Sequence, residues 1–178
     1  MNIKQFNDWL LRDDKQSLIM GILNVTPDSF SDGGQYLEKN TAIDHALEMV
    51  ENGADIIDIG AESSKPGSDP VPSKEQINKI EPVVESIREV SDIVISIDTR
   101  SSEVIKHLTK YKINIVNDIS SLEDPELLNI ISENPKIIII SSQMGSQKHS
   151  GSESYFYRAS KAAINNIMIT FSNELRRS

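Results

Sequence analysis

Residues 53–64 of the chain are GADIIDIGAESS, in which an apolar run follows a glycine turn and leads into polar residues. Short apolar runs of this kind recur, with amphipathic stretches between them. The runs are Leu18 to Val25, Asp55 to Ile59, Ile93 to Ile97, Ile113 to Val116 and Ile137 to Ile140. Nearly continuous apolar runs are typical of parallel strands that are buried on both faces. The sequence therefore predicts an α/β fold with a parallel sheet.

Amphipathic helices are predicted between these strands. The first begins near Thr41 and stops at Asn52-Gly53, because glycine readily adopts the left-handed conformation that ends a helix. Its predicted core face consists of Ile43, Ala46, Leu47 and Val50. The second helix begins at Ser73, with Gln76 at the spacing of a capping box. Pro82 should kink it or divide it into two segments, since proline lacks a backbone donor.

Three more helices complete the predicted βαβαβαβαβα order. One begins at about Ser101, and the next follows Asp124-Pro125, a cap followed by a first-turn proline. The last covers roughly residues 154–175. No low-complexity linker separates the units.

Composition excludes several classes of function. The 178 residues include 27 Asp and Glu against 18 Lys and Arg, a net charge of -9 that repels phosphate backbones and argues against nucleic-acid binding. Without cysteine, the chain has no disulfide framework or thiol nucleophile, and its 3 histidines are scattered. The first seventeen residues lack the apolar run of a signal peptide, and no segment reaches membrane-spanning length. We expect a cytoplasmic protein with no membrane partner.

Polar residues follow each predicted strand. They are Asn24, Glu62-Ser63-Ser64, Asp98, Asn117-Asp118 and Ser141-Ser142. Parallel strands joined by right-handed crossovers end at one edge of the sheet, where α/β proteins bind ligands. The alternative is that these strands merely leave into polar turns. Repetition over successive strands favours a ligand-binding rim.

Two loops on this rim are rich in turn-forming and polar residues. Residues 24–34 form a long βα connection that carries Phe30 among small polar side chains. Residues 62–68 place Ser64 and Lys65 after the second strand, and hydroxyls beside a lysine suit a phosphate or another oxyanion. The alternative is a pair of surface turns without a ligand.

Four segments, in order, resemble the dihydropteroate synthase family. Residues 20–34, MGILNVTPDSFSDGG, are similar to its opening signature, and residues 53–67 to its second, with Ser64-Lys65 where Thr-Arg is usual. Residues 96–99 and 116–119, SIDT and VNDI, resemble the ends of its third and fourth strands. The resemblance covers residues 1 to about 130.

The resemblance implies a TIM barrel that condenses 6-hydroxymethyl-7,8-dihydropterin diphosphate with 4-aminobenzoate and releases diphosphate. By the same resemblance, Asp98 and Asn117 would bind the pterin ring. Asn24 would contact Mg²⁺ or the diphosphate. The loops with Phe30, Ser64 and Lys65 would exclude water and help to hold the aminobenzoate.

The chain is too short for a whole barrel of this type, which takes roughly 250 residues. We therefore predict an incomplete TIM barrel of about five strands, with residues 1–134 as its N-terminal half. No segment matches the family's second pterin-binding aspartate, its lysine over the ring, or its Arg and His near the diphosphate. Activity should thus be impaired or absent in this chain. Exposed outer strands and barrel-facing apolar residues favour association, a homodimer included.

Residues 138–146, IIISSQMGS, and 157–165, YRASKAAIN, resemble the catalytic stretch of a short-chain dehydrogenase/reductase, so residues 135–178 are predicted to be a βα unit of that kind. Tyr157 and Lys161 are spaced to share one helix face, where the ammonium would lower the pKa of the phenol. By resemblance, Tyr157 would be the acid/base, Ser142 would bond the carbonyl oxygen and NAD(P) would be the cofactor. The glycine-rich nucleotide loop of such enzymes is absent. The alternatives are therefore a reductase fragment or a non-catalytic hybrid.

Overall fold

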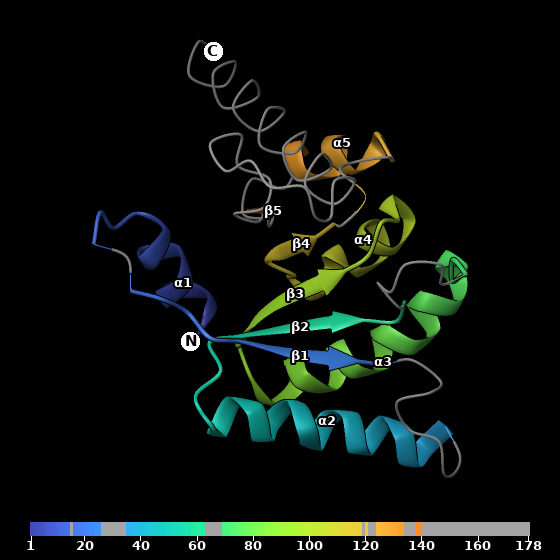
Figure 1. The fold of residues 1–178 in the computed structure, drawn as a ribbon, viewed down its shortest axis with the longest axis horizontal. Helices are drawn as coiled ribbons and strands as arrows, with labels where there is room; N and C mark the ends of the chain where they lie inside the picture. Colours follow the sequence, from blue (N-terminus) through green and yellow to red (C-terminus); the bar gives the residue numbers. More distant parts are fainter. Residues whose placement is uncertain are drawn as a thin grey trace, which may run out of the picture.

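The structure, a computed structural model, describes residues 1–14, 16–25, 35–62, 69–118, 120, 124–133 and 138–139, with only the backbone at 35–40 and 138–139. These residues form a 5-stranded sheet in the order β1-β2-β3-β4-β5, parallel throughout. The strands are β1 (Met20–Asn24), β2 (Ile56–Gly60), β3 (Val94–Asp98), β4 (Ile115–Asn117) and β5 (Ile138–Ile139). Each overlaps one of the predicted apolar runs, and β2, β3 and β4 extend one residue past the end of the run. Figure 1 shows the sheet.

The crossover helices pack on one face of the sheet. They are α2 (Gln35–Glu51), α3 (Ser73–Val90), α4 (Ser102–Leu108) with the short 3-10 helix η2 (Thr109–Tyr111), and α5 (Glu126–Glu133). Residues that alternate along the strands, such as Ile57 and Ile95, join these helices in one core. A doubly wound sheet reverses its strand order and carries helices on both faces. Strands in chain order with helices on one face are instead a segment of a βα barrel wall, which confirms the predicted class.

The opposite, inner face is covered at the starting ends of the strands by α1 (Ile3–Leu10), which lies beside the N-terminus in Figure 1. Phe6 is 1% exposed and packs with Ile56, Val94 and Ile115. This helix was missed in the sequence analysis. The sequence signal for this helix was Asn2 followed three residues later by Gln5, the spacing of a capping box. In the structure, Asn2 Oδ1 accepts from the backbone N–H of Gln5 at 2.8 Å, and Gln5 Oε1 accepts from the backbone N–H of Asn2 at 2.9 Å.

Helix α2 starts at Gln35, earlier than the predicted Thr41, and ends as expected before Gly53. The N–H groups of Gly53 and Ala54 bond to the carbonyls of Val50 and Met49, and Gly53 has a φ of 99°. This is a Schellman C-cap. The predicted core face was partly wrong. Ala42 and Ala46 are buried, and Met49 and Val50 pack against the same core.

Helix α3 runs unbroken through Pro82, so the predicted division was wrong. Core residues lie on both sides of the proline, with Ile80 and Val84 both at 0% exposed, and this packing holds one helix despite the lost donor. The predicted capping box was also wrong. Pro72 is the N-cap and makes no side-chain bond, while the Gln76 amide bonds elsewhere.

The two later helix starts were predicted correctly. Ser101 caps α4 through the N–H of Val104, and Asp124 accepts from the N–H of Glu126 before α5. The predicted helix at 154–175 lies outside the described residues. Within the described ranges, no helix has both the length and the apolar character needed to cross a membrane.

Candidate functional site

The carboxyl ends of four strands place Asn24, Gly60, Asp98 and Asn117 in one row. Asn24 is the register partner of Gly60, Gly60 of Asp98, and Asp98 of Asn117. Because side chains alternate between the faces of a sheet, residues in register across a row share a face. It is the inner face, since Ile59, Ile97 and Val116, the preceding residues, pack under the helices. Three predicted site residues are thus brought together by the register.

Gly60 occupies the one position in this row without a side chain. A Cβ there would lie 3.1 Å from the Cβ of Asp98 and 3.5 Å from its Oδ2. A larger residue would therefore push against the carboxylate. Glycine keeps space open at the centre of the row.

A second polar row lies one layer deeper on the same face. Asp58 is the register partner of Ser96, and the two are 4% and 0% exposed. Asn117 connects the rows, because its Nδ2 donates to Asp58 Oδ2 at 3.0 Å. Asp58 Oδ1 and Ser96 Oγ have no hydrogen-bond partner within the described part of the chain. Buried polar atoms without partners are rare and often mark a functional site.

A buried hydrogen-bond network supports the exit of β3. The Thr99 hydroxyl, on a residue 2% exposed, donates to Gln76 Oε1 at 2.7 Å, and Gln76 Nε2 donates to the carbonyl of Val71 at 2.8 Å. The N–H of Thr99 also bonds to the carbonyl of Asn117 at 3.2 Å. Residues 98 and 117 are therefore held on neighbouring strands by backbone bonds that continue past β3.

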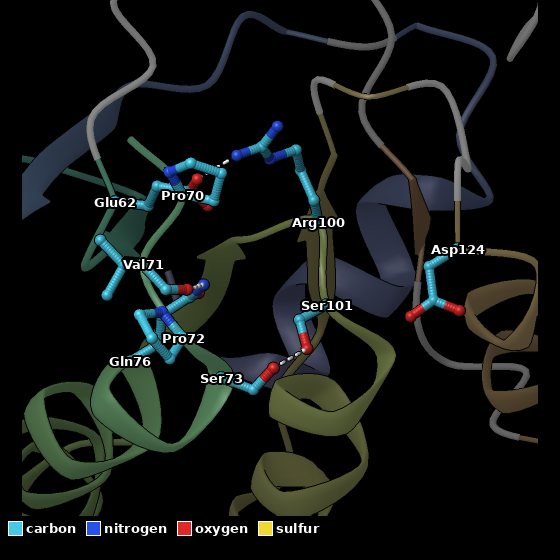
Figure 2. Close-up of a pocket in the computed structure, with 9 residues that line it drawn as sticks. All are labelled: Glu62, Pro70, Val71, Pro72, Ser73, Gln76, Arg100, Ser101 and Asp124. Atoms are coloured by element: carbon cyan, nitrogen blue, oxygen red, sulfur yellow. Dashed lines mark hydrogen bonds and ion pairs between the residues drawn. The ribbon is translucent and has the colours of Figure 1, made fainter. Parts of the chain in front are cut away.

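A cavity of about 560 Å³ lies at the same edge of the sheet, outside the row (Figure 2). Arg100 extends across it to an ion pair with Glu62, and Ser73 and Ser101 join their hydroxyls at 2.8 Å. On its far side, hydrogen bonds from Ser102 and the N–H of Glu126 hold the pKa of Asp124 below its usual value. Neither Asn24, Asp98 nor Asn117 lines this cavity, so it is a neighbour of the row rather than part of it.

Six predicted site residues lie outside the described residues: Phe30, Ser64, Lys65, Ser142, Tyr157 and Lys161. Sequence analysis missed Asp58, Ser96 and Arg100. A signal for the first two was available, since Asp58 stands two residues before Gly60 and Ser96 two before Asp98, spacings that put each on the same face. Arg100 carried no signal beyond its position after β3.

In the described residues, no group of three or more His, Cys, Asp and Glu side chains could hold a metal ion. Asn24 contributes an exposed amide at the end of β1. The amide oxygen of Asn24 would supply one ligand to Mg²⁺, which commonly keeps waters and substrate phosphates among its ligands.

A parallel sheet in chain order, with helices on one face and carboxylate and amide side chains at its carboxyl ends, places the chain in the TIM-barrel class, whose enzymes have their active sites at this edge. The chain belongs to the pterin binding enzyme family, whose model matches residues 20–176. It is 42% identical over 134 residues to the dihydropteroate synthase of Synechocystis, which covers 75% of this chain and 45% of that protein. The chain spans less than half the length of such curated relatives.

Solved structures agree with the family assignment. Dihydropteroate synthase from Xanthomonas albilineans with 4-aminobenzoic acid superposes with a TM-score of 0.66 and 35% identity, over 71% of this chain and 47% of that one. The Anaplasma phagocytophilum enzyme with bound 6-hydroxymethylpterin-monophosphate gives 0.66 and 34%, over 82% and 60%. Both likenesses cover less than two thirds of the solved chain.

The family match does not stop where a reductase segment was predicted to begin. It continues through residues 135–176, so the pterin-binding reading is favoured over a short-chain dehydrogenase/reductase there. The division into units 1–134 and 135–178 stays a prediction, because nearly all of the second unit lies outside the described residues.

Proposed function

We propose that the inner row of Asn24, Asp98 and Asn117 binds the pterin substrate of a dihydropteroate synthase. The supporting observation is the register that aligns these residues on one face, with Gly60 leaving room between them. Pterin rings carry N–H donors and ring-nitrogen acceptors along their edges. A carboxylate beside a carboxamide offers acceptors and a donor to match them.

In the proposed reaction, the amino nitrogen of 4-aminobenzoate attacks the pterin methylene carbon. The bond from that carbon to the diphosphate oxygen breaks, and the nitrogen loses a proton. Asp98 and Asn117 would orient the ring, and Asn24 would face the diphosphate or a bound Mg²⁺, which would supply positive charge to stabilise the departing diphosphate. The loop residues Phe30, Ser64 and Lys65 would exclude water and hold the aminobenzoate.

For this chain, we propose pterin binding. The complete reaction would require further strands. Ile22, on the inner face of β1, is 63% exposed, which fits an incomplete barrel. Further strands, or a second copy of the chain in a homodimer, would cover this face. Sedimentation of the purified chain at several concentrations measures such association.

The proposed function is tested by calorimetry of the 178-residue chain with 6-hydroxymethyl-7,8-dihydropterin diphosphate and Mg²⁺. We expect binding, and its loss in Asp98→Ala with an unchanged far-UV CD spectrum. Asp92→Ala is the matched control, because this exposed carboxylate precedes the same strand at its other end. Unaltered affinity in Asp98→Ala, or binding of NADPH in place of the pterin, would contradict the proposal.

A further inference from the structure

Asn117 carries two N–H groups and one carbonyl oxygen, and the fold uses one of these N–H groups. Its Nδ2 donates to Asp58 Oδ2 at 3.0 Å. This bond links β4 to β2, the strands on either side of β3. A carboxylate only accepts hydrogen bonds, so the nitrogen end of the amide must face Asp58. The chemistry of the bond therefore settles which way the Asn117 amide is turned.

Within the described residues, the Asn117 side chain makes one hydrogen bond, the bond to Asp58. It leaves one N–H and the carbonyl oxygen of Asn117, a single donor beside a single acceptor. Such a pair matches a heterocycle edge in one orientation. If the amide were reversed, the donor and acceptor would exchange places, and the same ring edge would no longer fit.

Asp58 is an unusual residue to find in this place. It interrupts an apolar strand, is 4% exposed and sits beneath the rim, where a carboxylate is costly unless it is well bonded. Yet within the described chain its Oδ1 has no hydrogen-bond partner, and neither has the hydroxyl of Ser96, its register partner. Stability alone gives no reason for a carboxylate there. Its single hydrogen bond, which comes from Asn117 on the rim, gives a functional reason.

We propose that Asp58 is a positioning residue, which turns the Asn117 carboxamide so that its carbonyl oxygen and remaining N–H face the bound heterocycle. The expected effect on ligand binding rests on the proposed pterin site. The orientation of Asn117 is a property of the ligand-free chain and is measured separately.

The first test is NMR of the ligand-free chain with labelled asparagine. The Asn117 side-chain signals are assigned by their loss in Asn117→Ala. In the unsubstituted chain, one of the two N–H protons should be shifted downfield and exchange slowly, because it is bonded to a carboxylate. Two ordinary, rapidly exchanging protons would overturn the inference without any variant at Asp58 having to fold.

The second test is the pterin affinity of Asp58→Asn, measured by calorimetry with the pterin diphosphate and Mg²⁺. The new amide should allow Asn117 to reverse, with a loss of at least about tenfold in affinity. Asp55→Asn is the matched control. It makes the same charge change at the starting end of the same chain segment, where Asp55 bonds to the N–H of Ile19, and should retain affinity.

A double-mutant cycle separates positioning from general damage. If Asp58 acts through Asn117, Asp58→Asn should cause little further loss in an Asn117→Ala background. Equal losses in both backgrounds would overturn the inference, as would equal affinities of Asp58→Asn and Asp55→Asn. Absence of pterin binding in the unsubstituted chain would contradict the proposed function instead, and the NMR result would still decide the positioning.

Discussion

Gly60 on β2 lies directly against Asp98 on β3, so closely that a Cβ at residue 60 would be 3.1 Å from the Cβ of Asp98. Gly60→Ala should therefore displace the Asp98 carboxylate and reduce pterin affinity by about tenfold, with a stability cost of about 1 to 3 kcal/mol from overpacking. Calorimetry and urea unfolding measure the two effects.

The control for this substitution is Gly53→Ala, on the turn before the same strand. Gly53 has a φ of 99°, and apart from its two chain neighbours no described residue has an atom within 4 Å of the position that a Cβ would take. The substitution should cost about 1 kcal/mol through backbone strain and leave pterin affinity unchanged. If both variants lost affinity equally, contact with Asp98 would not be the cause.

Arg88 joins the end of α3 to two loops at the starting ends of the strands. Its guanidinium donates to the carbonyls of Tyr111 at 2.9 Å, Ile93 at 2.6 Å and Lys112 at 3.2 Å. Arg88→Lys keeps a charge but loses the planar fork, so the free energy of unfolding should fall by about 2 kcal/mol. Urea unfolding measures this, and the exposed Lys106→Ala should change stability by less than about 0.5 kcal/mol.

The pH dependence of stability should contain a contribution from Glu81. Hydrogen bonds from Lys110, His107 and Tyr111 lower the pKa of its carboxyl to about 2 from 4.5. Because the pKa is lower in the folded state, the stabilisation is fully present above the unfolded value and is lost as pH falls from about 4.5 toward about 2.

Glu81→Gln should accordingly be less stable than the unsubstituted chain at pH 6, by about 1 kcal/mol. The difference should shrink as the pH approaches 2, which unfolding experiments across this range will measure. Glu75→Gln serves as the control. It removes the partner of Lys79 from an ion pair on the same helix, in which the two residues are one turn apart. A Glu81→Gln difference that is constant with pH would contradict the assigned ionisation.

Helix α1 should contribute strongly to stability because it covers the inner face where the strands begin. Phe6→Ala removes a side chain that is 1% exposed against Ile56, Val94 and Ile115, so about 3 to 5 kcal/mol should be lost. Leu11→Ala, at a position 85% exposed just after the helix, should have little effect. Thermal unfolding measures both, and similar values for the two would show that α1 is not a structural cover.

The strands and the polar residues that follow them were predictable from the sequence because their signals are local. An apolar run long enough for a buried strand, followed by Asn24, Asp98 or Asn117, is visible in a few neighbouring residues. Glycine at 53 likewise indicated the end of a helix through its own backbone freedom. The family resemblance rested on the same local segments.

The tertiary structure was needed wherever packing or register opposed a local signal. Pro82 should have divided α3, but the core on both sides of it kept the helix whole. Asp58 is a polar residue within an apolar strand, and its proposed role depends on Asn117, which is 59 residues away in sequence. Strand register across the sheet brings those two side chains together from neighbouring rows, because hydrogen bonding between strands, and not spacing along the chain, sets which residues lie near one another on a face.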